Sequence, residues 1–141
     1  MKIFFDTNIL LDIFSHRDTE SLFSLECFDF AADKKIIGYV AANQLDVFYY
    51  VMKKYVDKDF AFDCLKQILE CFVVVSYSKF NLINGMKSDF SDFEDGCLDD
   101  CAKLYCCDGI LTRNAKDFKN SKNTIYSPKD LVSLINIQPN I

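Results

Sequence analysis

The chain has 141 residues, half of them hydrophobic, which is enough for one domain with a buried core. Its formal net charge of −5 excludes a protein that holds nucleic acid by basic charge alone, so a nucleic-acid partner would require cations as well. No run of about 18 uncharged apolar residues occurs. Because Lys2 and Asp6 also interrupt the N-terminus with charge, neither a membrane span nor a signal peptide is expected, and we expect a cytoplasmic protein.

The seven cysteines do not follow a disulfide or zinc pattern. Cys97 and Cys101 stand one helical turn apart, but no second Cys pair has ligand spacing. The one histidine, His16, lies beside Arg17 and Asp18 and is interpreted as a surface loop residue. We therefore expect reduced, mostly buried thiols and no zinc site.

Strand-like and helical patterns alternate along the chain. In chain order we expect a strand at Lys2–Phe5, helices near Asn8–Phe14 and Glu20–Asp33, a strand at Ile36–Val40, helices near Asn43–Tyr55 and Asp59–Glu70, a strand at Phe72–Ser76, helices near Lys79–Lys87 and Asp92–Cys106, strands at Gly109–Thr112 and Thr124–Tyr126, and a last helix that begins after Ser127. Phe72–Ser76 is a continuous β-branched and aromatic run, which predicts a central strand. Ser127 is the expected N-cap of the last helix, with Pro128 at its first position.

Strands separated by helices predict a parallel sheet with right-handed crossovers. The expected fold is therefore α/β, a three-layer α/β/α sandwich formed by residues 1–141 as one domain. Ligands of such folds bind at the carboxyl ends of the strands, so polar residues at those ends are the candidates for a site.

Asp6 follows the first strand directly. A carboxylate there is costly to desolvate, so we expect it to face a cleft, a partner charge or a metal. Capping of the next helix is an equally good explanation for Asp6 taken alone, although Thr7 or Asn8 could serve as that cap.

The segment "DFEDGCLDDCAKL", residues 92–104, places Asp92, Asp95 and Asp99 on one face of a helix. A solvated face explains Asp92 and Asp99. Asp95 gains significance from "GILTRNAKDF", residues 109–118, where another strand ends on polar groups and Asp117 follows.

Asp46 lies in the first turn of the helix that follows the second strand. The helix dipole favours an anion there, so a purely stabilising role is credible, but the position is at the same sheet edge. Several carboxylates gathered in one cleft would repel one another unless a divalent cation were present. Oxygen ligands without Cys or His suit Mg²⁺ or Mn²⁺.

At this point the chain resembles the PIN-domain ribonucleases, which include the VapC-type toxins of toxin–antitoxin pairs. The resemblance extends from "FFDTNILLD" through "LDVFYYVMKK", "DFEDGCLDDCA" and "GILTRNAKDF" to "SPKDLV". The "D-x-x-YY" helix and the "TRN-x-KDF" segment are patterns of one subgroup. The resemblance implies a Mg²⁺- or Mn²⁺-dependent endoribonuclease that leaves 5′-phosphate and 3′-hydroxyl ends.

Carried over by position, the resemblance implies four catalytic carboxylates, Asp6, Asp46, Asp95 and Asp117. It implies that Asp6, Asp95 and Asp117 bind the metal, with Asn8, Thr112, Arg113 and Asn114 as supports of the site or contacts to substrate.

Two positions depart from the family pattern. Asn114 stands where many relatives carry Asp, and Asp46 stands where many carry the longer Glu. A basic rim for RNA phosphates is expected from Lys53, Lys54, Lys58, Arg113, Lys116 and Lys119, although each taken singly suits an ordinary solvated cation.

Other functions explain the motifs less well. A haloacid-dehalogenase-like phosphatase would need a second Asp at Asn8, and a receiver domain would need an Asp at the end of "CFVVVSYSKF". The remaining alternative is a non-catalytic PIN-like protein that binds a protein or RNA partner. Fourteen Phe in the chain also suit an antitoxin-binding or homodimer surface.

Overall fold

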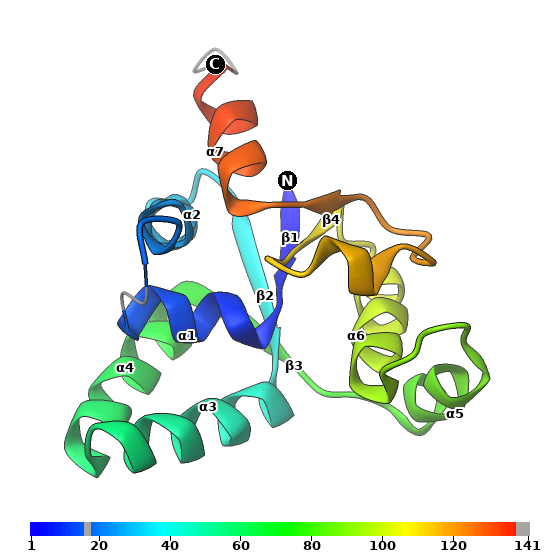
Figure 1. Ribbon diagram of the computed structural model, residues 1–141, viewed down its shortest axis with the longest axis horizontal. Coiled ribbons are helices and arrows are strands. Elements are labelled where there is room, and N and C mark those ends of the chain that lie inside the picture. The colour runs from blue at the N-terminus through cyan, green and yellow to red at the C-terminus, as the bar shows by residue number, and fades with distance from the viewer. Residues whose placement is uncertain (16–17, 138–141) are drawn as a thin grey trace.

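The computed structural model describes residues 1–15 and 18–137, so His16, expected in a surface loop, lies outside the described residues. Its core is a five-stranded sheet in the order β3-β2-β1-β4-β5, in which every pairing is parallel (Figure 1). The strands are β1 (Lys2–Phe5), β2 (Ile37–Ala41), β3 (Phe72–Val75), β4 (Gly109–Leu111) and β5 (Ile125–Tyr126). The predicted parallel α/β sheet is therefore confirmed.

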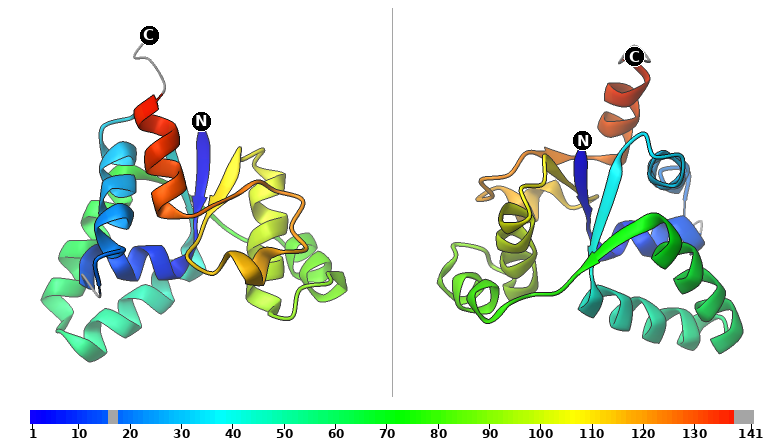
Figure 2. Two further views of the ribbon diagram at one scale, coloured as in Figure 1. Left: turned by 45° about the horizontal axis from the view of Figure 1, so that its top comes forward. Right: turned by 180° about the vertical axis from the view of Figure 1, so that it is seen from behind.

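Helices cover both faces of this sheet (Figure 2). One layer contains α1 (Thr7–Ser15), α2 (Ser21–Ala32), α3 (Ala42–Tyr55), α4 (Lys58–Cys71) and α7 (Pro128–Ile137). The other contains α6 (Phe93–Leu104) and the short 3₁₀ helix η1 (Ala115–Phe118), with α5 (Lys79–Lys87) packed outside α6. The three-layer sandwich matches the sequence prediction.

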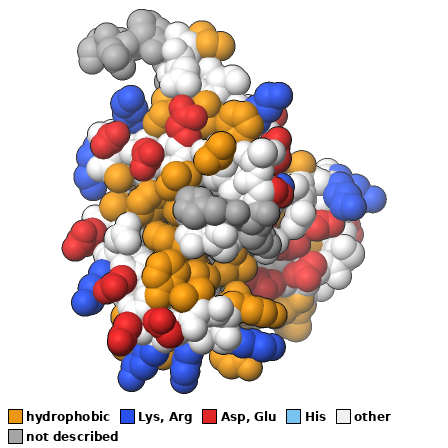
Figure 3. Space-filling model, turned by 60° about the vertical axis from the view of Figure 1, so that its left-hand side comes forward, with side chains coloured by type: hydrophobic (Ala, Val, Ile, Leu, Met, Phe, Trp, Pro, Cys, Tyr) orange, Lys and Arg blue, Asp and Glu red, His pale blue; other side chains and the backbone are white. Residues whose placement is uncertain are grey.

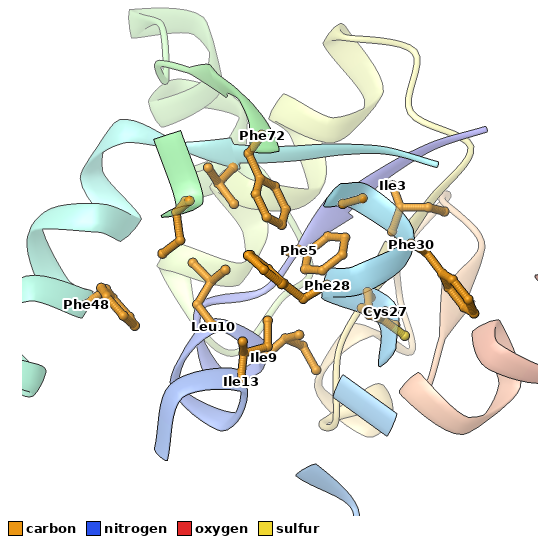
Figure 4. Packing of buried hydrophobic residues seen from close by; sticks show 14 of the residues in the cluster. Ile3, Phe5, Ile9, Leu10, Ile13, Cys27, Phe28, Phe30, Phe48 and Phe72 are labelled. Carbon is orange, nitrogen blue, oxygen red and sulfur yellow. The ribbon is translucent and has the colours of Figure 1, made fainter. Parts of the chain in front are cut away.

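Alternation along β1 divides the core into two parts. Ile3 and Phe5 are fully buried on the face covered by α1 to α4 and α7, where Phe5 packs edge-on against Phe72 (Figure 4). Phe4 points to the opposite face, toward α6 and η1. Because both faces of this central strand are covered, its three buried residues, Ile3, Phe4 and Phe5, are all apolar, as is typical of parallel sheets.

One sequence prediction was wrong in detail. Phe72–Ser76 was expected to form a central strand, but β3 lies at the edge of the sheet, where Val73 is 41% and Val74 is 37% exposed. The middle residues of β3 therefore leave apolar surface open to solvent.

The final helix begins as predicted, since the Asp130 N–H donates to Oγ of its N-cap Ser127 at 3.1 Å.

The parallel arrangement brings the carboxyl ends of the strands to one edge of the sheet (Figure 1). α1 begins there directly after β1 and α3 directly after β2, and η1 follows β4. Within the described part of the chain, no helix is long and apolar enough to cross a membrane.

Candidate active site

Asp6 lies at the end of β1 and is only 7% exposed. Its backbone N–H donates to the Leu111 carbonyl at 3.0 Å, which extends the pairing with β4 by one residue. Its carbonyl accepts from the Ile9 N–H at 3.0 Å, and its carboxylate interacts with the N–H of Thr7. Asp6 thus precedes α1 and contacts its first turn mainly through the backbone, while its buried carboxylate accepts from Thr112 at the carboxyl edge of the sheet.

Thr112 fixes that carboxylate from the neighbouring strand. Its hydroxyl is fully buried and donates to Asp6 Oδ2 at 2.8 Å. The same oxygen accepts from the backbone N–H of Asn114 at 3.0 Å. Burial raises the pKa of Asp6, this hydrogen bond lowers it in part, and the charges of Asp117 and Asp92 raise it further. The net effect is a carboxylate that is poorly stabilised as an anion.

Gln44 supports the same edge from α3, and the sequence analysis missed it. Its side-chain oxygen accepts from the Ala41 N–H at 2.6 Å, and its side-chain nitrogen donates to the Phe5 carbonyl at 2.8 Å. A second bond reaches Thr7 Oγ1 at 3.2 Å. A Gln at the third position of a helix is a known capping signal, but here it also joins β1 to β2.

Asp95 enters the site from the first turn of α6. Asp92 is the N-cap of that helix, and its carboxylate accepts from the Asp95 N–H at 3.1 Å. Partial burial raises the pKa of Asp95 to about 7, and Asp6 is the largest of the acidic neighbours that add to this effect. Asp95 and Asp6 are therefore close enough to repel each other, although they come from distant parts of the chain.

Asp117 is exposed on η1, and its charge raises the pKa of both Asp6 and Asp95. Its N–H donates to the Asn114 carbonyl at 2.9 Å, so the turn after β4 sets its position. The next residue, Phe118, is buried against Phe90 and anchors the helix.

Two more carboxylates belong to this cluster than the sequence suggested. Asp92 was assigned to a solvated face, yet its charge acts on both Asp6 and Asp95. Glu94 was not considered, and burial, Asp92 and Asp6 raise its pKa, in that order. Asp99, by contrast, points away, with its carboxylate bonded to Ser121 and to Asn123.

Asp46 was expected in the first turn of its helix, but α3 begins at Ala42, so Asp46 lies in the second turn, where it is exposed and lines a hollow with Asn43 and Tyr77. Asp6, Asp95 and Asp117 were expected to meet as ligands of one ion. In residues 1–15 and 18–137, no three acidic, Cys or His side chains converge closely enough to hold a metal. The carboxylates thus influence one another through their charges without forming a preassembled cage.

Arg113 differs from its expected role as a substrate contact. Its guanidinium bonds Asp12 at 2.9 Å and Asp18 at 3.1 and 2.9 Å, so it joins the turn after β4 to α1 and to the start of α2. Asn8 and Asn114 line a shallow hollow beside these groups. Arg113 is therefore a structural link more than a free cation of the rim.

The remaining cations of the expected rim lie in two regions of the chain, one at the end of α3 and the start of α4 and the other around η1. Lys53 and Lys54 lie in the last turn of α3, about 10–12 Å along the helix axis from Asp46, since each residue adds about 1.5 Å. Lys58 lies over the ring of Phe62. Lys116 and Lys119 are exposed on and just after η1, on either side of Asp117 in the sequence. These two are the rim cations best placed for substrate.

The site fits a divalent cation by its donor chemistry. Burial and mutual repulsion disfavour the charged forms of Asp6, Glu94 and Asp95. Within the described ranges, no Lys or Arg forms an ion pair with any of them. A hard cation that keeps several of its waters would relieve this repulsion without needing three direct protein ligands.

Comparison with known proteins identifies the family of the chain. The PIN domain family matches residues 2–116. Ribonuclease VapC1 of Aquifex aeolicus is 28% identical over 133 residues, covering 90% of this chain and 85% of that protein.

Two solved structures share the fold. VapBC2 from Rickettsia felis, bound to a DNA fragment from its promoter, superimposes with a TM-score of 0.69 at 16% identity, covering 90% of this chain and 98% of that one. A toxin-antitoxin complex from Klebsiella pneumoniae gives 0.65 at 21% identity, covering 89% and 97%. With its parallel sheet, its acidic strand ends and a family match over most of its length, the chain belongs to the PIN-domain family.

Proposed function

We propose that the protein is a divalent-metal-dependent endoribonuclease that acts in the cytoplasm as the toxin of a toxin–antitoxin pair. The main support is the cluster formed by Asp6 at the end of β1 and Asp95 at the start of α6, in which the charge of Asp6 raises the pKa of Asp95 and of Glu94 and no Lys or Arg of the described residues forms an ion pair with them. The family match and the VapC1 relative support a ribonuclease in particular.

In this proposal Asp6 and Asp95 hold Mg²⁺ or Mn²⁺, and Asp117 completes the negative edge. Thr112 keeps the Asp6 carboxylate oriented through its 2.8 Å hydrogen bond. Asp46 approaches from α3, and the RNA backbone passes over the hollow lined by Asn8 and Asn114. The cation, when bound, supplies an activated water nucleophile and stabilises charge on the phosphate.

The side chains of the protein would position the RNA and hold or release a proton at Asp95. With a pKa of about 7, Asp95 exchanges its proton near neutrality when no cation is present. Lys116 and Lys119 offset the repulsion between the acidic edge and an RNA backbone, since they are exposed beside Asp117.

The partner of the proposed toxin is a small antitoxin protein, and the chain also pairs as a homodimer. Hydrophobic side chains gather on the side of the molecule that carries α1 to α4 (Figure 3). Among the exposed apolar residues of these helices are Leu22 (62%), Phe62 (42%) and Leu69 (56%). Large exposed apolar areas are typical of protein interfaces. If cleavage is absent, binding through this surface is the second candidate function.

The proposal is tested by cleavage of labelled single-stranded RNA during a Mg²⁺ and Mn²⁺ titration. Asp6→Asn and Asp95→Asn are expected to lower the rate at least 100-fold, because each removes one carboxylate from the proposed cation site. Asp63→Asn, an exposed carboxylate on α4, is the matched control and is expected to cut normally. Cleavage that persists in EDTA, or in both site variants, would refute the proposal.

A further inference from the structure

A hollow of about 450 Å³ lies beside the acidic cluster, between the first turns of α3 and the segment that leaves β3. It is lined by Ala42, Asn43, Asp46, Ser76, Tyr77 and Leu82. Its volume lies within the range of small-ligand sites. The proposed ribonuclease activity does not yet use this hollow.

Two lining residues relate the hollow to the acidic edge of the sheet. Asp46, an expected member of the site, lines the hollow directly. Tyr77 is the second link, because burial raises the pKa of its hydroxyl and the charge of Glu94 raises it further. Glu94 in turn is coupled to Asp6. A group in the hollow would therefore lie next to a phosphate held at the carboxylates.

The lining suits a flat, neutral and partly polar group. Tyr77 contributes an aromatic ring, while Ala42 and Leu82 contribute apolar surface. Asn43 can both donate and accept hydrogen bonds. No Lys or Arg is among the described residues that line the hollow, and Asp46 adds negative charge, so an anion is disfavoured.

Tyr77 also contains an unsatisfied polar atom. Its hydroxyl is buried and makes no hydrogen bond of normal geometry within the described chain, although the Asn43 side chain lies near enough to lower its pKa. A buried hydroxyl without a partner is rare in folded proteins and calls for an explanation. The Tyr77 ring therefore lines the hollow although its hydroxyl has no hydrogen-bond partner among the described residues.

We propose that this hollow binds one unpaired nucleobase of the RNA strand whose phosphate lies at the acidic cluster. The inference rests on the proposed ribonuclease function. Proteins that read single-stranded RNA stack splayed bases on aromatic rings and hydrogen-bond their polar edges, which Tyr77 and Asn43 would do here. A base within a duplex could not enter, so the hollow selects single-stranded or looped RNA.

The test is binding of a fluorescein-labelled, unstructured RNA decamer, followed by anisotropy in Ca²⁺, with cleavage measured separately in Mg²⁺. Tyr77→Leu is expected to weaken binding about tenfold, the usual effect of losing one base–aromatic stack. Tyr77→Phe, which keeps the ring, is expected to recover most of that loss. Tyr55→Leu, at the far end of α3 and 74% exposed in the unmodified protein, is the matched control.

Abasic decamers identify the base itself. One abasic position next to the cleaved bond is expected to weaken binding about tenfold in the unmodified protein and about twofold or less in Tyr77→Leu. Equal losses in both proteins would overturn the inference. Ala42→Leu, which narrows the hollow from the α3 wall, is expected to weaken binding as well, and thermal unfolding checks that each variant folds.

The two proposals fail in different ways. If the protein binds the decamer through Tyr77 but does not cut it in Mg²⁺ or Mn²⁺, the nuclease proposal fails and the base site is retained. If the protein cuts RNA and Tyr77→Leu binds and cuts like the unmodified protein, only the base site is refuted.

Discussion

Thr112 has two hydrogen-bonding tasks at the centre of the site, donating to Asp6 and accepting from the Asn114 N–H. Thr112→Val keeps the shape but removes both bonds, which leaves the buried Asp6 carboxylate and the partly buried Asn114 N–H without this partner. We expect a loss of about 1–3 kcal/mol in the free energy of unfolding, measured with urea, and slower RNA cleavage. Ser133→Ala, which removes an exposed hydroxyl from α7, is expected to change neither quantity. An unchanged Thr112→Val protein would show that the hydroxyl is dispensable.

Asp95 makes the metal-free protein less stable as pH rises. The pKa of Asp95 is raised from 3.8 to about 7 in the folded protein, so between these values the folded state keeps a proton that the unfolded chain releases. The contribution of Asp95 to stability is therefore greatest below about pH 4, falls between about pH 4 and 7, and is constant above that range. Such a rise in pKa corresponds to about 4 kcal/mol, which solvent access to this half-buried side chain reduces to about 1–2 kcal/mol.

Asp95→Asn mimics the protonated side chain. We expect it to raise the free energy of unfolding by about 1–2 kcal/mol at pH 8 in EDTA and to flatten the profile between pH 4 and 7. Asp99→Asn, on the same helix but bonded to Ser121 and Asn123, should not reproduce this gain. If the free energy of unfolding of Asp95→Asn changed with pH in parallel with that of the unmodified protein, groups other than Asp95 would cause the pH dependence.

The sequence predicted individual site residues where a strand end marked them. Asp6 and Thr112 follow this rule, and Asp117 comes one turn later. Glu94 and Gln44 could not be identified in this way, because their positions depend on how α6 and α3 rotate against the sheet. That rotation is set by packing of distant residues, which one sequence does not display.

At the scale of elements, Arg113 holds the turn after β4 to the first two helices. It is 25% exposed, whereas its partner Asp12 is fully buried. Arg113→Met takes the guanidinium away from that buried carboxylate, so we expect a loss of about 3–5 kcal/mol in stability, measured with urea. The double variant with Asp12→Asn is expected to recover at least half of the loss. If the two single losses simply add, the pair is not coupled.

Contact between α5 and α6 depends on Gly85. A Cβ added there would lie 2.4 Å from the Sγ and 3.1 Å from the backbone N of Cys97 on α6. Gly85→Ala should therefore separate the helices and destabilise the protein by about 1–3 kcal/mol, although Ala is the better helix former. Met86→Ala, 69% exposed on the same helix, is the control and should have little effect in the same unfolding experiment. Equal stability of both variants would imply that α5 adjusts freely.

At the scale of the whole molecule, the sheet followed from the alternation of patterns, but the place of each strand within it did not. The apolar sequence of Phe72–Val75 predicts a buried strand. In the described structure, however, β3 lies at the edge of the sheet beside β2, and its middle residues, Val73 and Val74, are exposed. Strand order depends on which crossovers pack together, and an apolar edge strand resembles a central one in sequence. Exposed β3 and the apolar side of α1 to α4 are thus the surfaces that sequence patterns could not separate from core.

Binding of the proposed divalent cation at the acidic edge is expected to stabilise the whole chain. A cation that binds only the folded state adds about 2.7 kcal/mol at 100 times its Kd, which corresponds to a rise in Tm of about 5–10 °C for a chain of this size. We expect Mg²⁺ or Mn²⁺ to raise the Tm by this amount, and NaCl at matched ionic strength to leave it unchanged. The effect should be lost in Asp6→Asn and kept in Asp63→Asn, because Asp6 is buried in the coupled cluster whereas Asp63 is exposed on α4. A Tm that responds equally in both variants would place the bound cation elsewhere on this acidic protein.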